Sequence, residues 1–133
     1  MRLSTKLLLI LPATLLLAGC AATTLPEFEA AQTDRDVVPA SAQADIDADT
    51  TRFVGEVEGA EIYLARGVDD TLCLIHIRDD EWEQMGCGAG LGVGSTLESG
   101  TRLEAGTFRF PEQQIGEGTR EPLSESVTVI FQP

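Results

Sequence analysis

Basic residues are the scarcest class of side chain in this sequence. Lysine occurs once, at position 6, and asparagine is absent; 9 Lys and Arg stand against 22 Asp and Glu, giving a formal net charge of −13 at pH 7. Proteins bind nucleic acids through cationic contacts to phosphate, and anionic leaflets attract clusters of Lys and Arg. The composition therefore argues against a nucleic-acid partner and against a domain drawn to an anionic leaflet by its own charge.

The chain also lacks a hydrophobic run long enough to cross a bilayer. Its longest apolar run, residues 7–18, is shorter than the roughly 20 residues that a membrane-spanning helix needs. Arg2 and Lys6 precede it, which is the arrangement of a secretory signal peptide. We therefore expect residues 1–19 to be a cleaved signal peptide and the remainder to be exported.

The end of this segment carries a specific motif. The run Leu17-Ala18-Gly19-Cys20 resembles the lipobox of bacterial prolipoproteins. In that family the cysteine thiol receives a diacylglycerol, and signal peptidase II then cuts before it. The resemblance implies a lipid on Cys20, and an anchor at the outer face of the cell membrane, or in an outer membrane if the source cell has one.

The exported part divides into two regions by composition. Residues 20–49 are rich in Ala, Thr, Asp, Gln and Pro, with Phe28 as the single aromatic residue, and so offer little apolar surface to offset the entropy of ordering. We predict that they form the lipidated cysteine and a flexible tether that holds the domain away from the membrane. The folded domain is expected at 50–133.

Sustained helical periodicity is absent from this second region, which instead shows short β-type segments between turn signals. We predict an all-β domain of six to eight short antiparallel strands, arranged as a sandwich or a partly open barrel. The expected strands are 52–57, 60–66, 71–78, 82–87, 101–103, 107–110 and 126–131.

One hairpin can be predicted in register. A three-residue loop at 79–81 would place Arg78 opposite Trp82, within reach of its ring, and Cys73 opposite Cys87. Directly opposed Cα atoms lie within disulfide range. Because an even pair of cysteines remains once Cys20 is set aside, we predict a Cys73–Cys87 disulfide.

The same hairpin places His76, the one histidine, beside Leu74 and Gln84. Neither neighbour orients or activates an imidazole as a carboxylate does. We interpret His76 as a partly buried sheet residue that is hydrogen-bonded across the strand.

Glycine occupies every second position from Gly86 to Gly94. In a strand this spacing would leave one face without side chains and let another group approach closely. The alternative, which we slightly favour, is a mobile loop after the hairpin.

A spacing of acidic residues is similar to the EF-hand calcium loop. The carboxylates at its first, third, fifth and twelfth positions would be Asp45, Asp47, Asp49 and Glu56. However, Thr50 stands where the loop needs glycine, so the favoured interpretation is an acidic linker running into a strand, and a calcium-dependent envelope module is an alternative.

A second resemblance covers the cysteine region. The residues Cys73-Leu74-Ile75, followed by Trp82 and then Gly86-Cys87-Gly88, are similar to small uncharacterised lipoproteins of high-GC Gram-positive bacteria. The resemblance implies a tethered β domain with one cysteine bridge, and the family offers no activity to carry over.

The sequence therefore predicts a non-enzymatic binding or structural module of the cell envelope, without a cofactor and with an envelope protein as candidate partner. Tyr63, Arg78 and Trp82 are candidate binding residues, because aromatic residues and arginine dominate interface hot spots. The alternative from another class is a small hydrolase that uses carboxylates, with Asp79, Asp80 and Glu81 as candidates.

Overall fold

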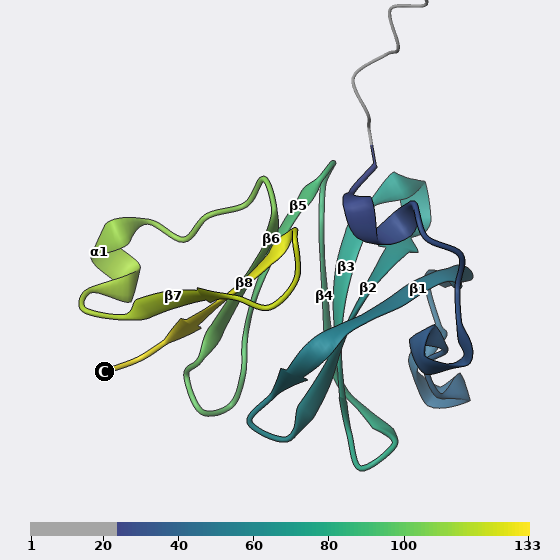
Figure 1. The fold of residues 1–133 in the computed structure, drawn as a ribbon, viewed down its shortest axis with the longest axis horizontal. Helices are drawn as coiled ribbons and strands as arrows, with labels where there is room; N and C mark the ends of the chain where they lie inside the picture. Colours follow the sequence, from purple (N-terminus) through teal and green to yellow (C-terminus); the bar gives the residue numbers. More distant parts are fainter. Residues whose placement is uncertain (1–23) are drawn as a thin grey trace, which may run out of the picture.

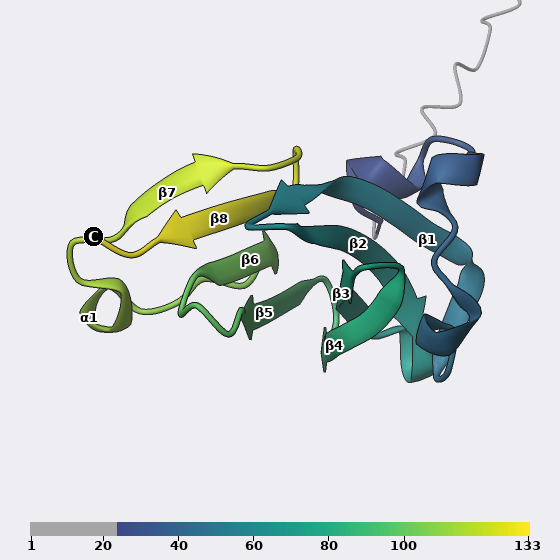
Figure 2. The ribbon, with the colours of Figure 1, turned by 90° about the horizontal axis from the view of Figure 1, so that it is seen from below.

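The computed structural model describes residues 24–133, so the predicted signal peptide and the Cys20 site lie outside the described residues. Eight antiparallel strands form two four-stranded sheets, with the orders β1-β2-β3-β4 and β5-β6-β8-β7. The strands are β1 (Ile46–Val57), β2 (Ala60–Gly67), β3 (Leu72–Arg78), β4 (Glu81–Gly88), β5 (Gly92–Thr96), β6 (Arg102–Gly106), β7 (Thr119–Pro122) and β8 (Val127–Phe131). Figures 1 and 2 show the sheets side by side along the long axis. The all-β prediction is confirmed.

Helical structure in the described residues is limited to short turns. Four 3₁₀ helices, η1 (Pro26–Phe28), η2 (Asp34–Asp36), η3 (Ala40–Ala42) and η4 (Val68–Asp70), accompany one α-helical turn, α1 (Glu112–Ile115). The first three precede β1 and lie against the first sheet in Figure 1.

The central strands of the first sheet are buried on both faces. Side chains on successive strand residues point to opposite faces, and every residue of β3 except Arg78 is buried. Ile62, Leu64, Leu72 and Leu74 face a core shared with the second sheet. The opposite face of β2 and β3 carries a second cluster that includes Tyr63, Cys73, Ile75 and Ile77.

The N-terminal segment supplies the cover for that outer face. Val38 and Ala42, each 2% exposed, pack in the outer cluster. Leu25 and Phe28 contribute to the shared core instead, so residues 24–45 contact both faces of the first sheet.

Polar contacts fix the same segment to β1 and β2. Asp36 accepts a hydrogen bond of 2.9 Å from the Phe53 amide. Arg35 pairs with Glu61 at 2.9 Å and lies 3.9 Å over the centroid of the Phe53 ring. Burial would raise the pKa of Asp36, but amide hydrogen bonds from Thr33 and Phe53 outweigh it and lower the pKa.

The predicted boundary at residue 50 is therefore wrong. The expectation of a flexible tether fails for residues 24–49, which are packed on the sheet, and β1 itself begins at Ile46. The few apolar residues of this segment are dispersed without a helical or strand period, because 3₁₀ turns and extended links carry them. Leu25, Phe28, Val38 and Ala42 pack against the sheet, and no sequence pattern distinguishes them from the exposed Val37.

The glycine-rich stretch forms parts of two strands instead of the favoured loop. Gly86 and Gly88 belong to β4, and Gly92 and Gly94 to β5, with a turn between. A side chain at Gly94 would overlap the ring of Phe108. The alternative of a bare face that admits a large group is thus correct, and 107–110, predicted as a strand, is an irregular segment that crosses this face.

Candidate binding site

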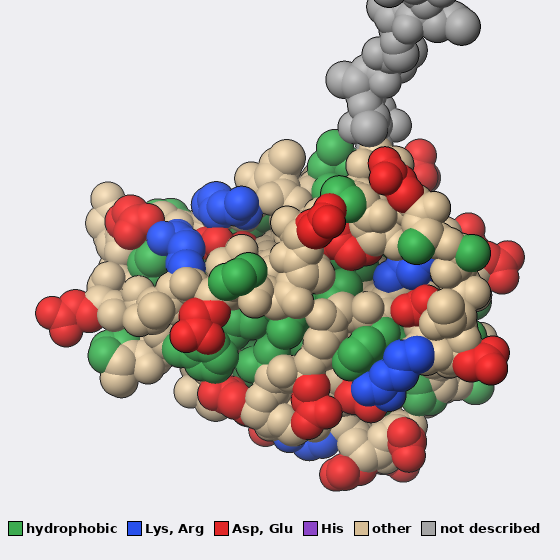
Figure 3. Space-filling view, in the orientation of Figure 1, with side chains coloured by type: hydrophobic (Ala, Val, Ile, Leu, Met, Phe, Trp, Pro, Cys, Tyr) green, Lys and Arg blue, Asp and Glu red, His purple; other side chains and the backbone are tan. Residues whose placement is uncertain are grey.

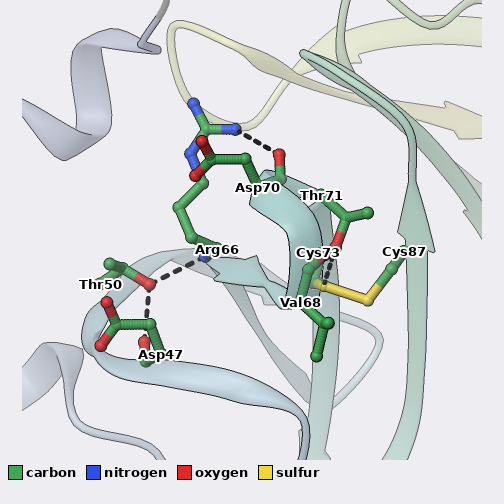
Figure 4. Close-up of a disulfide and its surroundings, with 8 residues drawn as sticks. All are labelled: Asp47, Thr50, Arg66, Val68, Asp70, Thr71, Cys73 and Cys87. Atoms are coloured by element: carbon green, nitrogen blue, oxygen red, sulfur yellow. Dashed lines mark hydrogen bonds between the residues drawn. A yellow bond between two sulfur atoms is a disulfide. The ribbon is translucent and has the colours of Figure 1, made fainter.

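The β3–β4 hairpin is the element on which most of the predicted site residues lie. Its register matches the prediction from Leu72, which pairs with Gly88, to His76, which pairs with Gln84. Cys73 and Cys87 stand directly opposite with Cα atoms 4.1 Å apart and form a disulfide. Figure 4 shows this bond beside the segment that joins β2 to β3, with the Thr71 hydroxyl 3.9 Å from the Cys73 sulfur. The predicted disulfide is confirmed.

The turn of this hairpin is one residue tighter than predicted. Asp79 and Asp80, with φ of 52° and 61°, form a two-residue turn, and Arg78 pairs with Glu81. Positive φ at both central positions is the geometry that matches the twist of a hairpin. A register shift between His76 and Ile77 absorbs the extra residue, so Trp82 pairs with Ile77 and not with Arg78.

Trp82 therefore lies on the face of the sheet that the N-terminal segment covers. Its side chain is 48% exposed and borders a cavity of about 290 Å³, whose other lining residues are Ser41, Ala42, Ala44, Asp45 and Met85. The Trp82 amide donates a 3.4 Å hydrogen bond to the Ser41 hydroxyl. The hairpin and the segment containing η3 thus form two walls of one partly apolar pocket, which we call the Trp82 pocket.

The other two predicted binding residues lie elsewhere. Tyr63 is 3% exposed and packs edge-on against Phe53, with ring centroids 5.5 Å apart. Burial, and then the charge of Glu61, raise the pKa of the Tyr63 hydroxyl. Arg78 does not stack on Trp82: it binds Glu83 at 2.9 Å and donates to the Glu58 carbonyl at 2.9 Å. Of the three candidates, Trp82 alone lines the pocket.

The residues proposed for calcium do not converge. Asp47, Asp49 and Glu56 are exposed along the extended strand β1, and Asp45 immediately precedes it. Asp47 pairs with Arg66 and Glu56 with Glu61, so at roughly 3.3 Å per residue of β2 these two carboxylates lie about 17 Å apart along the sheet. Within residues 24–133 no group of three or more His, Cys, Asp or Glu is placed to hold a metal ion. The EF-hand interpretation is wrong because these residues form a strand instead of a loop.

The carboxylates proposed for a hydrolase are gathered at the hairpin tip. Asp79, Asp80 and Glu81 are all exposed. A general acid and base need one environment that pushes two pKa values apart, and an exposed turn provides no such enclosure. These three carboxylates line neither the Trp82 pocket nor the cavity of about 400 Å³ beside Thr24.

His76 is more deeply buried than predicted. It is fully buried, and its Nε2 lies 2.9 Å from the Ser95 hydroxyl on β5 of the other sheet, while Nδ1 has no partner in the described structure. Burial lowers the pKa of His76. The hydrogen bond runs between sheets because β5 is a strand, which sequence reasoning had favoured as a loop. Ser95 and His76 are both buried, so their hydrogen bond links the two sheets inside the domain.

Glu104, a fully buried carboxylate on β6, was not predicted. It accepts hydrogen bonds from the Phe110 amide at 2.8 Å and from Arg120 at 3.1 Å. Arg120 also binds Glu112 at 2.8 Å, and hydrogen bonding to Glu104 and then Glu112 raises the pKa of its guanidinium. This network holds the segment between β6 and β7 against the second sheet. The predicted strand at 101–103 ended before Glu104, whereas β6 extends to Gly106, so no sequence signal revealed its burial.

No helix within residues 24–133 has both the length and the apolar character to span a membrane.

Comparisons with known proteins add no assignment. No protein family, no curated protein and no solved structure matches the chain.

Proposed function

We propose that this chain is an exported, lipid-anchored, non-enzymatic binding module of the cell envelope. The lipobox-like run Leu17-Ala18-Gly19-Cys20 supports the anchor, with a diacylglycerol on Cys20 that holds the chain to the outer face of a membrane. A doubly acylated anchor is stable by itself.

The observation that carries the binding role is the half-exposed indole of Trp82 at the rim of a pocket. Tryptophan is enriched among the residues that contribute most to binding at protein interfaces. The disulfide-linked hairpin holds one wall, and Ala42, packed in the outer cluster, belongs to the other. A preformed pocket with a fixed aromatic wall binds a partner at low entropic cost.

The expected contribution of Trp82 follows from its exposed area. A tryptophan side chain presents up to about 250 Å², so an exposed fraction of 48% leaves roughly 120 Å² for a partner to cover. At 25 cal/mol per Å² this area contributes about 3 kcal/mol, or on the order of a hundredfold in affinity.

The negative charge around the Trp82 pocket limits which chemical groups can bind there. Asp45 lines the pocket, and Figure 3 shows acidic side chains scattered over the face it displays, with few basic ones between them. Electrostatic complementarity therefore favours a neutral or cationic group in the pocket, such as an apolar or basic side chain of an envelope protein.

Photo-cross-linking in intact cells tests this role. Benzoylphenylalanine replaces Ser41 at the pocket, and in a matched chain it replaces Glu117, which is exposed on the loop after α1. We expect one reproducible cross-linked product from position 41, lost when Trp82→Ala is added, and none from position 117. Identical products from both positions, or a product from position 41 that survives Trp82→Ala, would contradict the proposal.

A further inference from the structure

We propose that the end of the domain formed by Thr24, η4 and the β4–β5 turn lies against the membrane that carries the Cys20 lipid, so that the Trp82 hairpin turn faces away from it. We call this surface the tether end; it comprises Thr24, Arg66, Val68, Asp70, Gly90 and Leu91. The inference rests on the proposed lipid anchor and specifies the partner of a second surface, a lipid headgroup layer.

Packing and hydrogen bonds fix the chain from Leu25 onward. Leu25 is 8% exposed in the shared core, and Phe28 packs against the same cluster. The Glu27 carboxylate accepts hydrogen bonds from the Ser124 hydroxyl at 3.1 Å and the Ser126 amide at 3.2 Å. Lengthening the tether would therefore require these contacts to break.

Covalent geometry limits the distance between Cys20 and Thr24. Three residues, 21–23, separate Cys20 from Thr24. Four Cα-to-Cα steps span at most about 14 Å, whatever their conformation. Thr24 must consequently lie within about 14 Å of the lipidated cysteine, and the domain cannot stand away from the bilayer on a long spacer.

Thr24 lies beside η4 and the β4–β5 turn. A cavity of about 400 Å³ is lined by Thr24, Arg66, Asp70, Gly90 and Leu91, which places η4 and the β4–β5 turn beside it. Figure 1 shows η1, η4 and this turn at the same end of the molecule. Val68 of η4 is 59% exposed and is the most exposed large hydrophobic side chain of residues 24–133. Close to a bilayer, such a side chain can enter the interfacial region.

The opposite end gathers three hairpin turns. The Thr101 hydroxyl donates to Glu58 at 2.8 Å, which joins the β1–β2 and β5–β6 turns. Figure 1 shows the β3–β4 turn at the same end. Gly88 pairs with Leu72 and Trp82 with Ile77, five residues further along β3, which places Trp82 about 17 Å further from the tether end.

Tether length, and not charge, sets this orientation. The distal turns carry the exposed acids Glu58, Asp79, Asp80 and Glu98, and the tether end carries the exposed acids Glu29, Asp69 and Asp70. With its turns directed outward, the domain presents Trp82 toward the envelope space.

Fluorescence quenching by spin-labelled lipid tests the orientation. The lipidated full chain is reconstituted in phosphatidylcholine vesicles containing a lipid with a headgroup nitroxide. The native chain reports from Trp82, its single tryptophan, and the double variant Trp82→Phe/Val68→Trp reports from the tether end. We expect the nitroxide to remove most of the emission from position 68 and little of that from position 82. As a matched control, twelve Gly and Ser residues are inserted between Ala22 and Thr23 of the double variant. This longer chain should stay on the vesicles but lose the quenching at position 68.

The outcomes separate this inference from the anchor. A chain that co-floats with vesicles but shows equal quenching at both positions, or stronger quenching at position 82, overturns the orientation and leaves the anchor intact. A chain without a lipid on Cys20 by mass spectrometry overturns both. Quenching that survives the insertion would show that the short tether is not its cause.

Discussion

The packing of the N-terminal segment can be tested with two adjacent valines. Val38 is 2% exposed in the outer cluster, whereas Val37 is 50% exposed. The substitution Val38→Ala removes two methyl groups from a buried site, at about 0.8 kcal/mol each for transfer, and it leaves a cavity in the outer cluster.

We expect Val38→Ala to lower the free energy of unfolding by about 2 kcal/mol. In a domain of this size such a loss lowers Tm by about 10 °C. Val37→Ala changes the same atoms at an exposed site and should shift stability by less than about 0.5 kcal/mol.

The assay is urea denaturation of the oxidised chain from residue 21 onward, followed by Trp82 fluorescence and by far-UV circular dichroism. A flexible tether predicts that neither substitution matters. If both variants unfold at the urea concentration of the parent chain, residues 24–45 do not pack as described, and the argument for a short tether fails with them.

Three further predictions concern the two sheets. Burial lowers the pKa of His76, so His76 binds a proton more readily in the unfolded chain than in the folded one. The free energy of unfolding should therefore fall as pH drops below about 6.5. Urea titrations at pH 7.5 and 5.5 should show this decrease, and His76→Gln should reduce it. Gly94→Ala places a methyl group in the phenyl ring packed over it and should lower the free energy of unfolding by about 1–3 kcal/mol. Gly86→Ala is the tolerated control, because the nearest atom to the added methyl group would be 3.6 Å away. Equal thermal stabilities of the two variants would refute the close approach. Glu104→Ala removes a fully buried carboxylate and leaves the Phe110 amide without its acceptor, which should cost about 1–3 kcal/mol by chemical denaturation. An equal cost for Glu112→Ala, at a 77% exposed side chain, would contradict this assignment.

The hairpin from β3 to β4 was accessible to sequence reasoning because its constraints are local. A run of β-type residues, a polar turn and two cysteines at matching distance from that turn are sufficient to predict which residues face each other. The tip differed from the prediction because a two-residue turn and a three-residue loop use the same polar residues. A register shift between His76 and Ile77 reconciles the tighter turn with the pairing of the cysteines.

The sequence indicated only one wall of the Trp82 pocket. Trp82 was a candidate through its residue type, but its opposite wall, Ser41 and Ala42, lies some 40 residues earlier in the chain. No periodicity connects the two walls, because the N-terminal segment crosses the sheet in short turns whose apolar residues match pockets on the sheet surface.

By itself, the sequence determined the all-β class, the disulfide and most of the hairpin register, since alternation, turn residues and cysteine spacing act between near neighbours in the chain. Tertiary structure alone decided that residues 24–45 belong to the domain, that Glu104 and His76 are buried, and that the glycines of β5 receive Phe108. These outcomes depend on which surfaces meet when two sheets and an irregular segment pack together. The burial of a side chain is then set by residues distant in sequence, which no local pattern encodes.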